Sequence, residues 1–263
     1  MRSSPAHGRP QTSTWTDADE QRLHLGVQAL GLRLDDACLT QVSRWAALLL
    51  QWNRTYNLLG AQDGGTLVGD HLLDSLAILP VIEQRLSARE QVLTDVGTGA
   101  GFPGILLAIA QPDRPIHLLE PIGKKVAFLR QSVLTLGLKN ARVLAGRIED
   151  LDALLSRERI TLPTGQPRHF ICRAFTALGR FASLCEPYMS EDSLAFAMKA
   201  ARLAEEQQQM PASMNVAAIE TLLTPNPDIQ RYLAILKRGT ALSADAASLA
   251  DQTVQSPSAR RPA

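Results

Sequence analysis

The residues whose types and spacing best suit ligand binding are the glycines between Leu93 and Gly104. This segment reads Leu-Thr-Asp-Val-Gly-Thr-Gly-Ala-Gly-Phe-Pro-Gly and contains Gly97, Gly99 and Gly101. Glycines at the junction of a strand and a helix allow positive φ angles and a close approach of the backbone to a ligand. The spacing from Gly99 also matches the dinucleotide fingerprint G-x-G-x-x-G. The segment therefore predicts a turn that binds a nucleotide-like ligand.

Asp95 helps to separate two classes of ligand. A dinucleotide would bring an anionic pyrophosphate to this turn, where the carboxylate of Asp95 would repel it. S-adenosylmethionine instead brings a sulfonium and an amino group, both of which are positive. Asp95 therefore favours S-adenosylmethionine over a dinucleotide, although a carboxylate at a strand end can also serve only as a helix cap.

Two later acidic segments fit the same nucleoside-like ligand. Glu120 follows the glycines by about 20 residues, the distance at which an acidic side chain accepts hydrogen bonds from ribose hydroxyls. Ile148 and Glu149 follow the next strand and would lie beside an adenine ring. Acidic residues are also common at the first turn of any helix because of its dipole, so a structural role for Glu149 stays open.

Two basic residues at strand ends are the candidates for catalytic residues. Arg173 and Lys199 each close a predicted strand at the edge where open α/β sheets bind ligands. Arg173 could bind the cofactor's carboxylate or a phosphate, and a salt bridge to Glu149 or Asp95 is the structural alternative. Lys199 could meet a substrate on the same edge, and a solvated lysine is equally common there.

Short apolar runs alternate with longer helical patterns from residue 91 onward, as expected for a largely parallel sheet. The expected strands are Val92–Val96, Ile116–Leu119, Arg142–Ala145, Phe170–Ala174 and Leu194–Met198. The expected helices between them are Pro103–Ala110, Gly123–Leu136, Glu149–Arg157 and Ala177–Met189. Two final runs, Val216–Leu223 and Tyr232–Lys237, suit an antiparallel hairpin at the sheet edge.

The region before the glycine turn is helical. Apolar residues recur at helical spacing over Asp17–Leu30 and Asp35–Trp52, and a third helix is expected over Leu67–Leu79, ending near Pro80. The expected division is a tail over residues 1–15, a helical cap over 16–82, an α/β domain over 83–238 and a tail over 239–263. Both tails lack the apolar surface that would offset the entropy of ordering them.

Several segments together resemble the guanine-N7 methyltransferases of bacterial 16S ribosomal RNA, the RsmG or glucose-inhibited division protein B family. The matching segments are Trp-Asn-Arg-Thr-Tyr-Asn-Leu at 52–58, His-Leu-Leu-Asp-Ser-Leu at 71–76, the glycine turn, Leu-Leu-Glu at 118–120, Gly-Lys-Lys-Val-Ala-Phe-Leu-Arg at 123–130, Arg-Ala-Phe at 173–175 and Met-Lys at 198–199. The first two segments are far more specific than the glycine turn.

The resemblance implies a class I, Rossmann-like methyltransferase with three α/β/α layers, a seven-stranded sheet and a small N-terminal helical cap. It implies cofactor contacts at the residues Gly97, Phe102, Ile148, Glu149 and Arg173, with 16S ribosomal RNA in the small subunit or an assembly intermediate as the partner. His71 and Asp74 lie three residues apart on one helix face, and we expect them to join the cap to the core.

The chain departs from the family pattern at three positions. Cys172 stands where the family usually has Ser before the Arg-Ala-Phe segment, and Ala200 stands where a Gly usually follows the Met-Lys pair. Asp70 replaces an Arg that commonly precedes the His-Leu-Leu-Asp-Ser segment. Because Asp70 would repel a phosphate, it puts RNA affinity in doubt more than cofactor binding.

The implied chemistry needs no acid or base. Guanine N7 carries an exposed lone pair, so the enzyme must chiefly hold it in line with the methyl group. Methylation of cytosine C5 would need a poised nucleophilic cysteine. Cys172 and Cys185 lie on predicted buried faces, so we interpret both as structural residues.

Composition leaves the partner open. The 263 residues contain 27 Lys and Arg against 26 Asp and Glu, so any RNA-binding surface must be a local patch. The three scattered cysteines indicate neither disulfides nor zinc, and we expect a cytoplasmic monomer with no metal and no stretch long enough to span a membrane. The alternatives are a class I methyltransferase for another RNA or a small molecule, a dinucleotide-binding oxidoreductase, and a non-catalytic nucleotide-binding module.

Overall fold

The computed structural model describes residues 14–60, 63–86, 91–199, 210–224 and 230–239. The two predicted tails lie almost entirely outside these residues, and so does the departure at Ala200. The division of the chain into a cap and a methyltransferase domain stays a prediction.

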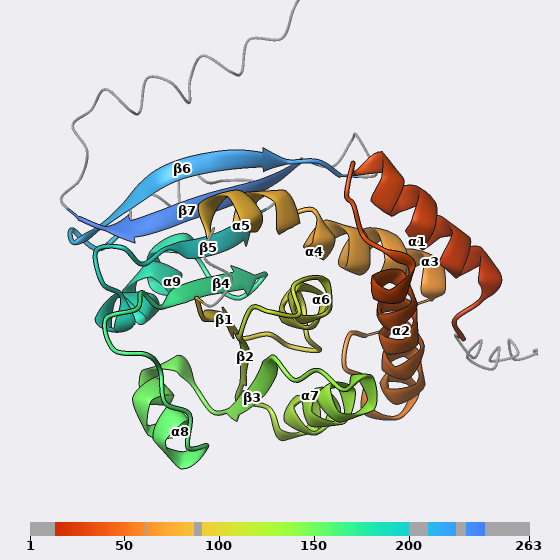
Figure 1. Cartoon of the computed structure of the whole chain (residues 1–263), viewed down its shortest axis with the longest axis horizontal. Helices are drawn as coiled ribbons and strands as arrows, with labels where there is room; N and C mark the ends of the chain where they lie inside the picture. The colour runs from red at the N-terminus through yellow and green to blue at the C-terminus, as the bar shows by residue number, and fades with distance from the viewer. Residues whose placement is uncertain (1–13, 61–62, 87–90, 200–209, 225–229, 240–263) are drawn as a thin grey trace, which may run out of the picture.

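Seven strands form one sheet in the described part of the chain, in the order β3-β2-β1-β4-β5-β7-β6 (Figure 1). Their bounds are β1 Leu93–Val96, β2 Ile116–Glu120, β3 Ala141–Ala145, β4 His169–Arg173, β5 Ala195–Lys199, β6 Met214–Leu222 and β7 Arg231–Arg238. Strands β1 to β5 pair in parallel, and β7 runs antiparallel to both of its neighbours. The predicted strands and hairpin are confirmed to within about two residues at each end.

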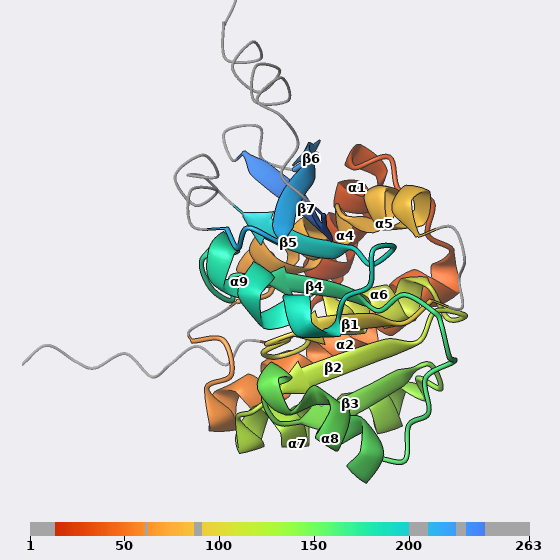
Figure 2. The ribbon, with the colours of Figure 1, turned by 90° about the vertical axis from the view of Figure 1, so that its left-hand side faces the viewer.

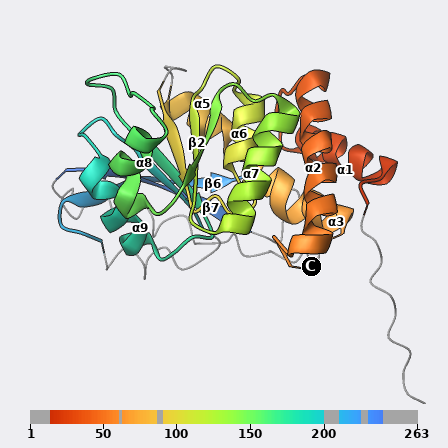
Figure 3. The ribbon, with the colours of Figure 1, turned by 90° about the horizontal axis from the view of Figure 1, so that it is seen from below.

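The sheet is covered on both faces because its central strands are apolar on both sides. Ile171 packs into the core that the N-terminal helices and α6 share, whereas Phe170 and Cys172 pack into the core under α8 and α9. Figures 2 and 3 show α6 and α7 on one side of the sheet and α8 and α9 on the other. The predicted three-layer α/β/α architecture is confirmed.

The helices connect the strands at the predicted places. Their bounds are α6 Gly104–Ala110, α7 Gly123–Leu136, the 3₁₀ segment η2 Ile148–Asp150, α8 Leu151–Arg157, α9 Leu178–Cys185 and the 3₁₀ segment η3 Glu186–Tyr188. The region expected to be one helix over Ala177–Met189 therefore tightens into a 3₁₀ turn after Cys185, where Pro187 stands in the first turn of η3.

The N-terminal region consists of α1 Asp17–Ala29, α2 Asp36–Tyr56, α3 Gly64–Thr66, the π-helical segment η1 Leu67–Leu73, α4 Asp74–Leu76 and α5 Leu79–Arg85. The prediction that the third helix ends near Pro80 was wrong, because α5 begins at Leu79 and continues to Arg85. Pro80 occupies the first turn of α5, where a missing N–H breaks no helical hydrogen bond.

The helical run Gly64–Arg85 also corrects the expectation about membrane spans. By length and composition it could cross a membrane, since an 18-residue window has a mean hydropathy of 1.3. Within the protein 61% of that window is buried, and Leu72, Leu76 and Ile78 are fully buried in the core next to the sheet. Packing against the sheet accounts for the apolar character of this run.

The segment Trp-Asn-Arg-Thr-Tyr-Asn-Leu closes the loop after α2. Asn53 Oδ1 accepts hydrogen bonds from the N–H groups of Leu58 and Leu59, at 2.6 and 2.9 Å. Lys124, at the start of α7, donates to the carbonyl oxygens of Tyr56 and Asn57 at 2.7 and 3.2 Å. Figure 3 shows α2 and α7 side by side, so this segment attaches the N-terminal helices to the sheet layer.

Candidate active site

The glycine turn connects β1 to α6 at the carboxyl edge of the parallel strands. Gly97, Gly99 and Gly101 have φ angles of 68, 64 and 112°, which side chains rarely adopt. A Cβ atom added to Gly99 would find no protein atom closer than 3.9 Å, so the backbone there faces open space. The predicted strand–turn–helix context is present, and it leaves room for a ligand against the backbone at Gly99.

Asp95 lies beneath this turn and is fully buried. Its Oδ2 accepts hydrogen bonds from the Thr98 hydroxyl at 2.6 Å and from the N–H of Gly104 at 2.8 Å. Its Oδ1 is also buried and has no hydrogen-bond partner among the described residues. Burial raises the pKa of Asp95 to about 7, against the hydrogen bonds from Thr98 and Gly104, which lower it. Asp95 therefore holds the turn in shape, and a direct contact with the cofactor stays a prediction.

The raised pKa of Asp95 predicts a pH-dependent stability. In the unfolded chain a carboxyl group of this type loses its proton near pH 4, whereas the folded protein retains it up to about pH 7. The folded state thus binds more protons between these values, so its free energy of unfolding falls as pH rises from about 4 to 7. The Asp95→Asn variant should lack this contribution, because an amide does not titrate between pH 4 and 7. Its amide oxygen can still accept the hydrogen bonds from Thr98 and Gly104, so the turn should keep its shape.

Chemical denaturation at several pH values measures this difference between the native protein and Asp95→Asn. Asp152 provides the control, because its exposed carboxylate pairs with Arg168 at 2.7 Å on the surface. The Asp152→Asn variant should keep the native pH profile between pH 4 and 7. An unchanged profile in Asp95→Asn would show that Asp95 is ionised over this whole range.

Glu120 ends β2 beside the glycine turn and is buried. Its Oε2 accepts the N–H of Gly99 at 2.9 Å, and its Oε1 accepts the N–H of Ile122 at 2.9 Å. A carboxylate oxygen can accept more than one hydrogen bond, so each of these atoms can also serve a hydroxyl group. Glu120 therefore links the turn to the start of α7, and its predicted contact with the ribose stays a prediction.

Phe102 joins the turn to the N-terminal helices. Its ring packs edge-on against Trp45 of α2 with the centroids 4.9 Å apart, and the His71 ring lies 5.2 Å away. The guanidinium carbon of Arg173 lies 5.2 Å from the Phe102 centroid. Only 5% of Phe102 is exposed, so in this structure the ring anchors the cap to the glycine turn.

Arg173 at the end of β4 makes its contacts with the cap. Its guanidinium donates to the His71 carbonyl, to Asp74 Oδ2 and to the Ser75 hydroxyl at 3.0 to 3.1 Å. Its second terminal nitrogen lies 2.6 Å from His71 Nδ1. The alternative of a salt bridge to Glu149 or Asp95 is corrected, since the partner is Asp74. The expectation that His71 and Asp74 join the cap to the core is confirmed.

The charge states within this cluster follow from burial. Burial, followed by the nearby Arg173, lowers the pKa of His71 to about 4, so the imidazole is neutral at physiological pH. Nδ1 of a neutral ring with its proton on Nε2 accepts a hydrogen bond from Arg173. Asp74 carries the negative charge, and its other oxygen accepts from Arg231 of β7 at 2.8 Å. One carboxylate thus connects η1 and α4 to two different strands.

Lys199 and Phe175 stand at the neighbouring strand ends. Lys199, the last residue of β5, donates from Nζ to the carbonyl oxygen of Thr176 at 2.5 Å. Phe175 precedes Thr176, and a Cβ atom added to Gly97 would lie 2.3 Å from its ring. The segment 173–176 therefore contacts both the glycine turn, through Phe175, and Lys199, through Thr176.

Ile148 and Glu149 lie at the end of β3, on the side of α8 and α9. Ile148 is buried in the core under these helices. Glu149 is exposed, and its carboxylate lies 3.7 Å from Arg180 of α9. Its carbonyl oxygen accepts the Tyr188 hydroxyl at 2.8 Å. Their contact with an adenine ring stays a prediction.

Two residues at this edge escaped the sequence analysis. Phe175 belongs to the Arg-Ala-Phe motif, and an aromatic residue two positions after a predicted catalytic residue is a usable signal. Lys125 lies near the glycines, since an added Cβ atom at Gly99 would be 3.9 Å from its Nζ. No pattern in the sequence distinguishes it from the other lysines and arginines around α7.

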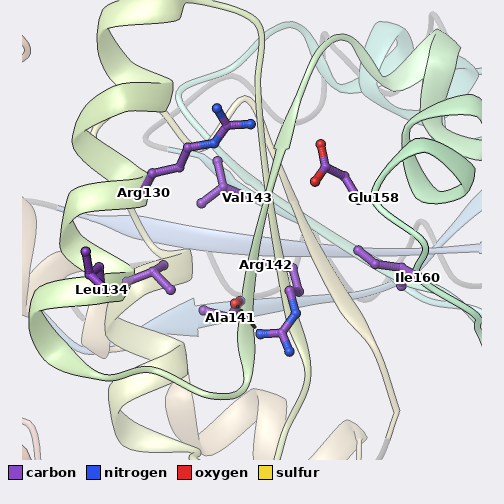
Figure 4. A pocket seen from close by; sticks show the side chains of 8 residues that line it. Arg130, Leu134, Ala141, Arg142, Val143, Glu158 and Ile160 are labelled. Atoms are coloured by element: carbon purple, nitrogen blue, oxygen red, sulfur yellow. Dashed lines mark hydrogen bonds between the residues drawn. The ribbon is translucent and has the colours of Figure 1, made fainter.

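The structure also contains a groove of about 300 Å³ at the edge of the sheet, between α7, β3 and the segment after α8 (Figure 4). Its walls include Arg130, Leu134, Val143 and Ile160. Arg142 donates to the carbonyl oxygens of Lys139 and Ala141 at its rim. The groove contains none of the predicted site residues. Among the described residues, no group of three or more His, Cys, Asp or Glu side chains is placed to hold a metal ion.

The mixed seven-stranded sheet with a glycine turn after β1 and an acidic residue at the end of β2 defines a class I methyltransferase. The chain belongs to the family described as rRNA small subunit methyltransferase G, whose model matches residues 38–233. Its methyl donor is S-adenosylmethionine.

Relatives of the same family match over most of the chain. The ribosomal RNA small subunit methyltransferase G of Acinetobacter baumannii is 37% identical over 83% of this chain and 97% of its own length. The protein of the same name from Neisseria meningitidis is 36% identical over 83% of this chain and 98% of its own. Among solved structures, TrmN from Thermus thermophilus aligns with a TM-score of 0.46 and 15% identity, over 62% of this chain and 48% of that chain.

The residues at the glycine turn fit S-adenosylmethionine. The open space over Gly99 admits a ligand against the backbone, and Glu120 offers carboxylate oxygens to hydroxyl groups beside it. Asp95 adds no charge toward a ligand, because it is fully buried beneath the turn and its pKa is raised to about 7, so the predicted selection of a positive ligand by Asp95 is not supported.

Proposed function

We propose that this protein transfers a methyl group from S-adenosylmethionine to N7 of a guanine in 16S ribosomal RNA. The substrate is the small ribosomal subunit or an assembly intermediate, and the protein acts as a monomer in the cytoplasm. The observation that carries this proposal is the family match over residues 38–233, combined with a glycine turn of matching chemistry. The oxidoreductase alternative has less support, because the family model that matches residues 38–233 is that of an rRNA methyltransferase.

The cofactor would lie along the carboxyl edge of β1, β2 and β3. In this proposal the backbone at Gly99 allows its close approach, with Gly97 and Gly101 shaping the turn against Phe175 and Ile105, while Glu120 binds the ribose hydroxyls. Ile148 and Glu149 lie beside the adenine ring. S-adenosylmethionine supplies an activated methyl group, so the chain itself needs only to bind, orient and exclude water.

The guanine would be held beside β4 and β5. Its N7 lone pair can attack a methyl group without losing a proton, so no general base is required, and alignment is the main contribution of the protein. Lys199, positioned by its hydrogen bond to Thr176, would meet guanine O6 or a nearby phosphate. Arg173 would bind the cofactor's carboxylate from the position that its contacts with His71 and Asp74 define.

The cysteines do not support the alternative of cytosine C5 methylation. Cys172 and Cys185 are both at most 1% exposed, on the β4 and α9 sides of the same core. Burial raises the pKa of the Cys185 thiol well above its usual range, which suppresses the nucleophilic thiolate. Both residues fill space in the core, as the sequence analysis interpreted them.

The proposed reaction is tested by supplying labelled S-adenosylmethionine and small-subunit particles from cells that lack this protein. We expect one methyl group per particle, at N7 of a single guanine located by cleavage of the modified RNA. A short oligonucleotide should be a much poorer substrate, because a chain of near-zero net charge cannot hold naked RNA by electrostatics alone. The rate should also fall steeply with salt.

Fully methylated particles from cells that contain the protein are the matched control, and they should accept no further label. A label on a cytosine, on a protein or on a free nucleoside would contradict the guanine-N7 assignment but leave cofactor binding intact. Binding of the nicotinamide dinucleotide with higher affinity than S-adenosylhomocysteine would instead reject the methyltransferase assignment of the site.

A further inference from the structure

Phe175 is an aromatic residue exposed beside the proposed cofactor turn. Its ring packs against Gly97 so closely that an added Cβ atom there would lie 2.3 Å from Cδ2 and 2.8 Å from Cε2. The rest of the residue faces outward, with 38% of its surface exposed. A single exposed apolar residue is common on protein surfaces, so the contact of this ring with the proposed cofactor turn at Gly97 is the observation that points to a function.

The backbone on both sides holds the ring in this place. Ala174 has a φ angle of 50°, a conformation that costs a residue with a Cβ atom roughly 1 kcal/mol or more. Arg173 before it is held by four contacts with His71, Asp74 and Ser75. Thr176 after it accepts the hydrogen bond from Lys199. The ring is therefore positioned by constrained neighbours on both sides along the chain.

The chemistry of an exposed ring at this place matches a nucleobase. Proteins that recognise unpaired bases stack them on aromatic side chains, because every base has a π face. An enzyme that modifies a base must also take it out of its stack and hold it against a replacement surface. Phe175 packs against Gly97 of the proposed cofactor turn, and the next residue, Thr176, accepts the hydrogen bond from Lys199, so the ring is near both the methyl donor's site and the proposed base-binding lysine.

We propose that Phe175 is the base-binding residue against which the target guanine stacks during methyl transfer. This inference rests on the proposed function, and it adds the surface that orients the base. The ring supplies π overlap and alignment, while Lys199 meets the polar edge of the base. The competing assignment, in which the ring contacts only the cofactor, is an outcome of the test.

The test compares Phe175→Leu with Phe175→Tyr, because leucine keeps an apolar side chain and removes the ring, whereas tyrosine keeps the ring. Each variant is assayed for kcat and KM on small-subunit particles and for S-adenosylhomocysteine affinity by calorimetric titration. We expect Phe175→Leu to lower kcat/KM about 5- to 150-fold, the range for one lost base–aromatic stack. We expect Phe175→Tyr to retain the native kcat/KM, and both variants to retain native affinity for S-adenosylhomocysteine.

Several outcomes would overturn the inference. Native kcat/KM in Phe175→Leu would show that no stacking occurs, and an equal loss of S-adenosylhomocysteine affinity would assign the ring to the cofactor. Loss of activity in Phe175→Tyr as large as in Phe175→Leu would exclude a role for the ring face. If Phe175→Leu does not fold, ultraviolet cross-linking of the native protein to particle RNA decides, with a guanine adduct at Phe175 expected.

The same experiments distinguish failure of the proposed function from failure of the inference about Phe175. If the native protein places no methyl group on guanine N7, the proposed function and this inference both fall. If the native protein methylates N7 and Phe175→Leu does so at the native rate, only the inference falls. Thermal unfolding of each variant controls for stability throughout.

Discussion

The Arg173→Ala variant is expected to lose on the order of 3 to 5 kcal/mol of unfolding free energy, the scale for removing one partner from a buried ion pair. The side chains of Arg173 and Asp74 are only 14 and 11% exposed. Removing the guanidinium leaves Asp74 with Arg231 alone and removes the donors to His71 and Ser75. Because His71, Asp74 and Ser75 attach the N-terminal helices to the sheet through Arg173, the rate of methyl transfer should also fall.

Denaturant unfolding of Arg173→Ala and of a matched surface variant measures this effect. Arg180 is the control, because it also pairs with a carboxylate but is 64% exposed and lies 3.7 Å from Glu149. Arg180→Ala should change stability by less than about 0.5 kcal/mol. Arg173→Lys should rescue only part of the loss, since an ammonium group cannot reproduce the fork of contacts. Native stability in Arg173→Ala would mean that Arg173 serves a ligand alone.

The Gly99→Asn variant is expected to lose S-adenosylmethionine affinity on the order of 100-fold, about 2.7 kcal/mol, while remaining folded. Gly99 has a φ angle of 64°, which asparagine tolerates better than most residues. A Cβ atom at this position would lie 3.9 Å from Gly97 O and from Lys125 Nζ, so the added side chain would extend over the turn without a clash at its base. The variant therefore obstructs the proposed ligand without disturbing the surrounding core.

Gly137 offers a matched control for this binding experiment. It has the same φ angle of 64° at the end of α7, and a Cβ atom there would meet no atom within 4 Å. Gly137→Asn should bind S-adenosylmethionine with native affinity in the same titration. If Gly99→Asn also bound with native affinity, the backbone at Gly99 would not touch the cofactor, and the cofactor assignment of the turn would be lost.

The sequence predicted the sheet well because its signals are local. Each strand from β1 to β5 is a short apolar run bounded by a turn, and the hairpin of β6 and β7 was recognised from two such runs without a helix between them. The predicted helix end at Pro80 was wrong because proline is disfavoured inside a helix but favoured in its first turn, where Pro80 lies. The break into η1, α4 and α5 depends on packing against the sheet, which no local pattern encodes.

The sequence predicted which residues belong to the candidate active site, but it did not predict which partners those residues contact. Asp95, Glu120, Arg173 and Lys199 were each placed at strand ends, and the structure puts them there. The partner of Arg173 could not be predicted, because Asp74 lies 99 residues away along the chain. Likewise, the position of Phe175 over Gly97 follows a positive φ angle at Ala174, and an alanine gives no sign of such a conformation in the sequence.

The double pairing of Asp74 has a consequence for the order of events during protein synthesis. The N-terminal helices leave the ribosome first, yet Asp74 receives Arg173 only 99 residues later and Arg231 only 157 residues later. At about 5 to 20 residues per second, the second arginine arrives roughly 8 to 30 s after the carboxylate has been made. Until Arg173 has been made the Asp74 carboxylate has neither arginine partner, and until Arg231 has been made it has one of the two. We therefore expect the N-terminal helices to reach their full attachment to the sheet only after β7 has been translated.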